Sequence, residues 1–266
     1  PPVSVAPIVS SATVASPTNP DASVLAEARR LWQARQHNAA RALIQAAIDK
    51  GHASGALRMA QWAYSEAFTQ PLAGRRLVLV RRSPADLPLV RAAWADRPFM
   101  ERFHRMAPPL PADDAALARV LEREAQATLL DAKNLHWTIM RTDGQRVGMM
   151  SFVEVALRHQ RAEFVVGVRD ETLGLALEAS LLALEFAFSV IRLHKVCSAV
   201  YGENNYALRS TVHLGFQREG TLRDHLFDPS NGQWVSLHLS ALFKEDFHTA
   251  ANQRLAQRLL NRSLRI

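Results

Sequence analysis

The segment from Ala162 to Phe216 constrains the fold of this chain most strongly, because strand patterns and helix patterns alternate in it. The run AEFVVGV is rich in branched and aromatic residues, which favours a strand over residues 162 to 168. The following ETLGLALEASLLALEFAFSVI is apolar over about five turns and predicts a long buried helix. LHKVCSAVY (193 to 201) predicts a second strand, and ENNYALRSTVHLGF (203 to 216) predicts a turn and a short helix. The segment therefore indicates an α/β unit.

The junction between the first predicted strand and its helix suits an anion. The first N–H groups of a helix have no partner inside the helix, so they point at whatever lies beyond the strand end. Gly174 lets backbone approach a ligand closely, and Ala176 keeps the surface low. A glycine before an apolar helix also occurs as a packing feature alone, so the junction leaves both interpretations open.

The flanking segments predict further strands and helices. RRLVLVRRSPADLPLVRAAW (75 to 94) reads as an alternating strand and a helix start, in which Ser83 suits the cap and Pro84 the first turn. HWTIMRT and QRVGMMSFVEV flank Asp143-Gly144, a strong signal for a two-residue hairpin. After Phe216, REGTLRDHLF, a DPSNG turn and WVSLHLSALF predict a terminal two-stranded hairpin.

Three short motifs carry a resemblance to a known family. Asn204 begins an Asn-x-x-Ser-like helix, Leu214-Gly215-Phe216 ends it, and Gly220-Thr221-Leu222-Arg223 follows on a strand. On these motifs, residues 75 to 246 resemble a GNAT-superfamily N-acetyltransferase of the ribosomal-protein-alanine type. The resemblance implies an α/β (α+β) GNAT fold, in which a mixed central sheet is flanked by helices.

The resemblance also implies a site for acetyl-CoA as co-substrate. In the family, two central parallel strands splay apart, and the pantetheine arm bonds to the exposed backbone of the first strand. The pyrophosphate then meets the backbone amides of the loop that enters the helix. By resemblance, the cofactor contacts are Val166, Gly167, Val168, Arg169, Gly174, Leu175, Ala176, Leu177, Asn204 and Arg209.

Direct attack of a neutral amine on the thioester requires a proton acceptor, and the leaving thiolate is helped by a proton donor. The resemblance makes Glu163, at the base of the cofactor strand, the positional candidate for the base. The Ser and the general-acid Tyr of the family align with Ala207 and Thr211, so the neighbouring Ser210 and Tyr206 are the candidate donors. An ordinary structural or surface role stays open for each candidate.

The phosphate loop departs from the family pattern of Gln or Arg, two residues, Gly, one residue, and Gly or Ala. This chain has Glu171-Thr172-Leu173-Gly174-Leu175-Ala176. Glu171 suits the helix dipole but repels a pyrophosphate, so either cofactor binding is weakened or a shifted register brings in Arg169. Two functions stay open: an N-acyltransferase for a protein N-terminus, an amino sugar or a small amine, and a catalytically degenerate GNAT-fold module that binds or scaffolds a partner.

Length and composition allow a substantial core. The 266 residues, 48% of them hydrophobic, suit one large domain with an accessory segment. The apolar run LLALEFAFSVI is interrupted by Glu185 and is too short for a membrane span, so no membrane association is expected. The single cysteine, Cys197, excludes an internal disulfide and is consistent with the cytoplasm. A first residue of Pro is compatible with a trimmed or partial polypeptide.

The net charge of +7 invites a nucleic-acid interpretation, but the basic residues are scattered and no motif interleaves them with aromatic residues. Their densest group, NQRLAQRLLNRSLRI, predicts a basic amphipathic helix within residues 247 to 266. The ten histidines lack paired ligand spacing, so the sequence predicts no metal site.

The first 70 residues have a different composition. Residues 1 to 20 contain five prolines and no charge, which is typical of a disordered linker. Residues 21 to 70 are Ala-rich with breaks near residues 36–38 and 51–52, which predicts three short helices. The spacing of Trp32 and the alanines after it resembles a tetratricopeptide-like helical repeat. Such a segment is expected to pack on the transferase domain or on a protein partner.

Overall fold

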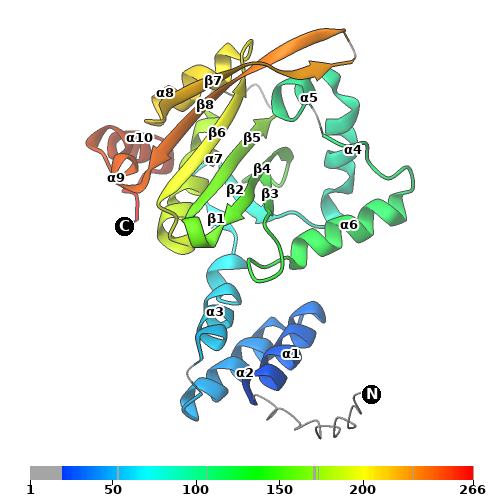
Figure 1. Cartoon of the computed structure of the whole chain (residues 1–266), viewed down its shortest axis with the longest axis vertical. Helices are drawn as coiled ribbons and strands as arrows, with labels where there is room; N and C mark the ends of the chain where they lie inside the picture. Colours follow the sequence, from blue (N-terminus) through cyan, green and yellow to red (C-terminus); the bar gives the residue numbers. More distant parts are fainter. Residues whose placement is uncertain are drawn as a thin grey trace, which may run out of the picture. The chain divides into compact units, whose positions relative to one another are not determined.

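The computed structural model describes residues 20–265 apart from 53, 106, 170, 171, 173 and 230 (Figure 1). The linker expected over residues 1 to 20 therefore lies, except for residue 20, outside the described residues. The chain divides into two compact units, Pro1–Tyr64 and Ser65–Ile266.

The first unit contains the three predicted helices, α1 (Pro20–Gln33), α2 (His37–Asp49) and α3 (Gly55–Ala63). Its core is built around Trp32, whose ring stacks between His37 and Tyr64 at centroid distances of 4.2 and 4.5 Å. The Ser54 hydroxyl caps α3 by accepting a hydrogen bond from the backbone N–H of Leu57. Small Ala side chains let these helices approach closely.

The second unit is built on one eight-stranded sheet with the order β1-β2-β3-β4-β5-β6-β8-β7. Of the neighbouring pairs, only β5 and β6 run parallel, so the sheet is mixed. The strands are β1 (Leu72–Ala73), β2 (Leu77–Arg81), β3 (Leu135–Arg141), β4 (Arg146–Ala156), β5 (Arg161–Val168), β6 (Lys195–Tyr201), β7 (Gln217–Asp228) and β8 (Gln233–Phe243).

The helices of this unit are α4 (Leu87–Ala95), α5 (Arg97–Phe103), α6 (Asp114–Gln126), α7 (Leu175–Phe186), α8 (Asn205–His213), α9 (Lys244–Phe247) and α10 (Ala250–Leu260). Short 3₁₀ turns lie at Glu66–Phe68, Pro84–Asp86 and Leu157–His159, and a π-helical turn at Ala187–Ile191 extends α7. The predicted fold class, a mixed sheet flanked by helices after a small all-α segment, is confirmed.

The helices cover the sheet from both faces. Trp137 of β3 packs against Phe186 of α7 with ring centroids 5.4 Å apart, and it pairs across the sheet with Met150. Met149, the preceding residue of β4, packs instead with Leu117 of α6 in a core shared by α4, α5 and α6. Because successive strand residues point to opposite faces, α7 lies on one face and α4–α6 on the other.

Local signals in the sequence are found where they were predicted. Asp143-Gly144 lies in the turn between β3 and β4, which is longer than the predicted two-residue hairpin, and Gly144 has a φ of +90° that favours glycine. Ser83 and Asp86 form a capping box around Pro84. The terminal hairpin is β7–β8, and Figure 1 shows its turn reaching toward α5.

The C-terminal region forms one helix shorter than the predicted range. In α10, Leu255 and Leu260 are buried while Arg254 and Arg258 are exposed, as an amphipathic helix requires. Within the described residues, no helix combines the length and apolar character needed to cross a bilayer.

Candidate functional site

The sheet opens between β5 and β6. These strands pair over three residue pairs, the last joining Glu163 to Cys197, and within the described residues their pairing does not continue further. β5 goes on to Val168 against β4, whereas β6 goes on to Tyr201 against β8. The strands therefore diverge after Glu163, and the backbone of residues 164–168 faces the resulting fork.

Val166, Gly167 and Val168 form the diverging end of β5. A Cβ added to Gly167 would overlap ring atoms of Phe103 and would lie 2.9 Å from Cζ of Phe99. Both rings belong to α5 and are stacked, with centroids 5.2 Å apart. The absent side chain of Gly167 thus lets α5 pack directly on the strand at one side of the fork.

The helix that follows β5 begins at Gly174, which adopts a φ of +85° as the N-cap of α7. Leu175, Ala176 and Leu177 form its first turn, so their N–H groups lie at the positive end of the helix dipole. Of the loop before them, Glu171 and Leu173 lie outside the described residues. The predicted arrangement of a strand that leads into a helix start beside the fork is therefore present.

Arg169 directly follows β5 and forms an ion pair with Asp96. Its Nε donates to Oδ2 of Asp96 at 3.2 Å, and its backbone N–H donates to the carbonyl of Val147 at 2.7 Å. Asp96 is the N-cap of α5 and also accepts from the N–H of Phe99. The charge of Arg169 is thus paired on the α5 side of the sheet.

Glu163 is the last β5 residue that pairs with β6, so its carboxyl lies at the base of the fork. Burial raises its pKa above the ordinary value, and the nearby Glu154 carboxylate raises it further, while Arg161 acts in the opposite direction. Burial likewise raises the pKa of the Cys197 thiol across the pair, which keeps it protonated rather than nucleophilic.

The remaining predicted residues lie on α8 after β6. Asn204 caps this helix, its Oδ1 accepting from the N–H of Ala207 at 3.1 Å. Tyr206 is 55% exposed and Ser210, one turn later on the same helix face, is partly buried. Arg209 is exposed. The base candidate Glu163 lies on β5, whereas the donor candidates lie on α8. Among the described residues, no hydrogen bond joins Glu163 to this group.

Two hydrogen bonds connect α5 to the other arm of the fork. The Tyr201 hydroxyl accepts from the backbone N–H of Arg105 at 2.9 Å, and Nδ2 of Asn204 donates to the carbonyl of Arg102 at 3.3 Å. The Arg105 guanidinium also lies over the Tyr201 ring, 5.1 Å from its centroid. These contacts join α5 and the residues after it to the end of β6 and the start of α8.

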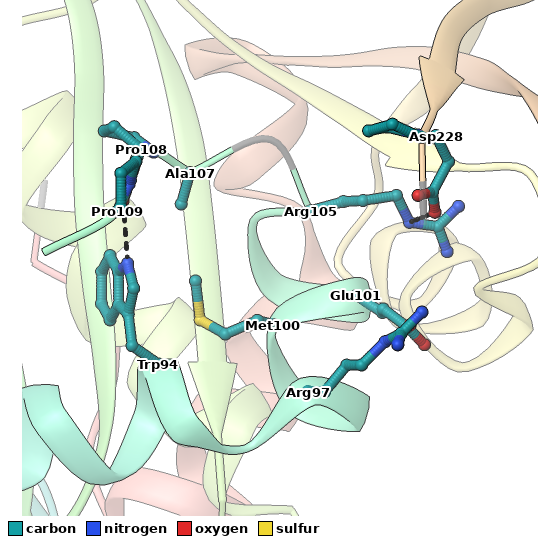
Figure 2. Close-up of a pocket in the computed structure, with 10 residues that line it drawn as sticks. Trp94, Arg97, Met100, Glu101, Arg105, Ala107, Pro108, Pro109 and Asp228 are labelled. Carbon is teal, nitrogen blue, oxygen red and sulfur yellow. Dashed lines mark hydrogen bonds and ion pairs between the residues drawn. The ribbon is translucent and has the colours of Figure 1, made fainter. Parts of the chain in front are cut away.

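A cavity of about 610 Å³ lies beside α5 and the turn of the terminal hairpin (Figure 2). Two ion pairs line it, Arg97 with Glu101 at 2.8 Å and Arg105 with Asp228 at 3.8 Å. Its apolar wall includes Trp94, whose indole N–H donates to the carbonyl of Pro108 at 3.0 Å. Since Phe99 and Phe103 of the same helix lie over Gly167, α5 borders both this cavity and the cofactor strand.

Sequence patterns did not single out several residues that border the fork. Phe99, Phe103 and Arg105 fall within residues 99–106, which the sequence indicated only as one border of the amine entry, and Tyr201 falls within a predicted strand. Arg76, which contacts the start of α7, precedes Gly174 by 98 positions. No local motif encodes such a contact, because it exists only once β2 and α7 are packed together.

Side chains that commonly bind metals do not cluster in the described part of the chain. Across those ranges, no three or more His, Cys, Asp or Glu side chains gather in a way that could hold a metal ion.

Comparisons with known proteins agree with this architecture. A sequence model of the acetyltransferase (GNAT) domain matches residues 76–217. The spermidine N(1)-acetyltransferase of Escherichia coli (strain K12) is 32% identical over 111 residues, which cover 41% of this chain and 59% of that protein. The match thus spans less than two thirds of this curated relative.

Solved structures share the fold. The spermidine N-acetyltransferase of Vibrio cholerae, solved with CoA and spermine, superposes with a TM-score of 0.57 at 20% identity and covers 65% of this chain and 99% of its own. A GNAT-family acetyltransferase of Bacillus anthracis gives a TM-score of 0.54 at 18% identity and covers 66% of this chain and 99% of its own. GNAT acetyltransferases use acetyl-CoA as co-substrate. Because the matched domain spans more than half of the residues and includes the fork and the start of α7, this chain belongs to the GNAT acetyltransferase family.

Proposed function

We propose that this chain is an N-acetyltransferase that moves an acetyl group from acetyl-CoA to a primary amine by direct attack. The observation that carries the proposal is the divergence of β5 from β6 next to the start of α7. The exposed backbone of residues 166–168 supports binding of the pantetheine arm as an added strand. The N-terminal amides of α7 support binding of the pyrophosphate. Of the other predicted contacts, Asn204 and Arg209 are proposed to meet the cofactor from α8, whereas Arg169 is paired with Asp96.

The cavity beside α5 is proposed as the entry of the acceptor. The amine is proposed to enter between residues 99–106 and the hairpin residues 218–240, and α5, Arg105 and Asp228 of these segments line the cavity. Arg97 pairs with Glu101, and Arg105 pairs with both Asp228 and Glu203. These ion pairs contain three carboxylates and two guanidiniums, an excess of negative charge that is compatible with a cationic amine. Candidate acceptors are a protein N-terminus, which the ribosomal-protein-alanine type implies, an amino sugar, and a small amine such as the polyamine named for the Escherichia coli relative.

Glu163 is proposed as the base of the reaction. A new bond forms between the amine nitrogen and the acetyl carbon, the bond from that carbon to sulfur breaks, and the amine loses a proton to the base. The raised pKa of Glu163 supports this role, because a less acidic carboxyl accepts a proton more readily near neutral pH. Ser210 or Tyr206 would return a proton to the leaving thiolate.

The N-terminal helices are proposed to bind a protein partner. The three short helices of this segment and the resemblance of its sequence to a tetratricopeptide-like repeat support this proposal. The enzyme is proposed to act in the cytoplasm. Pull-down of partners by residues 1–70 fused to a carrier, compared with the full chain, tests whether the N-terminal helices bind a protein partner.

Isothermal titration of acetyl-CoA into the full chain tests the function. We expect micromolar-range binding, followed by release of free thiol when amines of the three classes are supplied. A thiol-reactive dye detects turnover whichever amine accepts the acetyl group. No heat and no thermal stabilisation at millimolar acetyl-CoA would refute the enzyme and favour the degenerate binding module.

Replacing Glu163 by Gln tests the base. We expect turnover to fall while acetyl-CoA affinity is kept, because the amide cannot accept the amine proton. Turnover of the unmodified enzyme should decline as the pH falls through the raised pKa of Glu163. Glu154→Gln is the matched control: it removes a charge that raises this pKa, so the acidic limb should move to lower pH with turnover retained. Unchanged turnover in Glu163→Gln would remove this residue from the mechanism.

A further inference from the structure

The cavity beside α5 has an apolar side and a charged side, as Figure 2 shows. Its apolar side is made by the side chains of Trp94, Ala107, Pro108 and Pro109, and Met100 lies between the two sides. Its charged side is made by the side chains of Arg97, Glu101, Arg105 and Asp228. At about 610 Å³ the cavity has room for a small molecule that contacts both sides.

The apolar side suits an alkyl or aryl group. The indole N–H of Trp94 donates to the carbonyl of Pro108 at 3.0 Å, so the single polar atom of this side chain is already committed. Ala107 and the two prolines carry no polar side-chain atom, and a proline has no backbone N–H to donate. An ammonium or hydroxyl group placed here would lose its hydration with no side chain to replace the water.

The charged side of the cavity lies toward the fork between β5 and β6. The backbone N–H of Arg105 donates to the Tyr201 hydroxyl at 2.9 Å, and the Arg105 guanidinium lies 5.1 Å from the centroid of the Tyr201 ring. Tyr201 is the last residue of β6, which forms one arm of the fork. An acceptor whose apolar part lies against Trp94 therefore directs its amine toward the fork.

The charges of this side balance one ammonium group. Arg97 pairs with Glu101 at 2.8 Å, and Arg105 pairs with Glu203 at 2.5 Å and with Asp228 at 3.8 Å. Three carboxylates against two guanidiniums leave one negative charge in excess, which the amine of a bound acceptor neutralises. A second ammonium group on a chain that extends toward Trp94 would reach the apolar side, where no carboxylate lines the cavity.

We propose that this cavity selects a primary amine with one positive charge and an apolar substituent, and that the substituent lies against Trp94. This assignment rests on the proposed function and narrows its acceptor class. Alkylamines, arylalkylamines and peptides that begin with an apolar residue belong to the selected class. Polyamines and amino sugars do not, because their additional ammonium or hydroxyl groups would face the indole and the prolines.

The test compares hexylamine with cadaverine, in which a second amine replaces the terminal methyl group. Release of free thiol from acetyl-CoA gives kcat/KM for each, and we expect hexylamine to exceed cadaverine by at least about tenfold. Trp94→Ser should lower kcat/KM for hexylamine by roughly tenfold and that for cadaverine by less than about twofold. Trp234→Ser is the matched control, because Trp234 is 61% exposed on β8 and does not line the cavity.

Ala107→Asp tests the assignment in the opposite direction. Ala107 is half-buried in the apolar side, so a carboxylate there should raise kcat/KM for cadaverine relative to hexylamine by roughly tenfold. Thermal unfolding confirms that each variant is folded, and Ala107→Asp decides the question if Trp94→Ser does not fold.

Three results would overturn the assignment: cadaverine or glucosamine used as well as hexylamine, equal losses for both amines in Trp94→Ser, or no change of preference in Ala107→Asp. Absence of thiol release with every amine would instead refute the proposed function. The cavity is then tested without acetyl-CoA, by chemical-shift titration of the Trp94 indole N–H with hexylamine. No shift of that signal would overturn the assignment as well.

Discussion

Gly148 of β4 is the position where one added methyl group most directly tests the β4–β5 contact. A Cβ on Gly148 would overlap the carbonyl oxygen of Gly167 and would lie 2.9 Å from Cα of Val168. Ordinary contacts of this kind begin at 3.4 Å. Because the opposing atoms are backbone rather than the end of a flexible side chain, β5 itself must move, by about half an ångström or more.

The displaced segment includes the candidate pantetheine contacts. Gly148 pairs with Val168, and Met149 pairs with Gly167. Overpacking costs about 1–3 kcal/mol, and each weakened ladder hydrogen bond costs about 1 kcal/mol. We therefore expect Gly148→Ala to lower the free energy of unfolding by roughly 3 kcal/mol, which corresponds to a fall in Tm of roughly 10 °C for a domain of this size.

Gly220 provides the matched control. It also lies in a strand, β7, at a φ that other residues tolerate, and a Cβ there would meet no atom within 4 Å. Gly220→Ala should leave stability unchanged or raise it slightly, because alanine restricts the unfolded chain. Both substitutions add one methyl group. They differ only in whether that group meets neighbouring atoms.

Scanning calorimetry and hydrogen exchange report on these two variants. The calorimetric transition gives the change in stability, and exchange of the β4 and β5 amides shows whether the loss is local. Acetyl-CoA affinity should fall in Gly148→Ala and stay constant in Gly220→Ala. Unfolding of Gly148→Ala within about 0.5 kcal/mol of the unmodified chain, or an equal loss of stability in both variants, would refute the steric origin of the effect.

Two further predictions concern buried polar groups. Burial lowers the pKa of His136 to about 3, with Arg82 and Arg81 acting in the same direction, so His136 is neutral in the folded state at pH 7. Its contribution to stability is complete above the unfolded value of 6.5 and is lost as the pH falls toward 3, at up to about 1.4 kcal/mol per pH unit; urea titrations should show that His136→Gln lacks this component. Asn252 is 2% exposed and donates to the carbonyls of Leu214 and Phe247, so Asn252→Ala should cost about 2 kcal/mol in thermal unfolding, whereas the exposed Asn205→Ala should not. Equal effects of the two Asn substitutions would contradict this.

The fold was predictable wherever the information is local. The alternating strands, the turn at Asp143-Gly144 and the cap at Ser83 depend on residues within a few positions of one another, and each is found at its predicted place, although the turn is longer than two residues. The strand, helix, strand and helix of residues 161–213 follow the same rule. The hydrophobic periodicity and the turn residues of these segments favour the same local structure before and after the chain folds.

The candidate site was only partly predictable, because its charges are partnered over long sequence separations. The sequence indicated Arg169 as a source of charge for the phosphate loop, but tertiary packing brings Asp96 to it. Likewise, a buried Glu178 within an apolar helix gives no sign that Arg76 is its partner.

The sequence by itself determined the elements, the family motifs near Asn204 and the position of Glu163 at the base of a strand. Only the tertiary structure decided where β5 leaves β6 and which cation borders α7. The physical reason is the range of the forces involved. Backbone propensity acts within a turn or a strand, whereas strand divergence, burial and ion pairing depend on neighbours that only folding brings together.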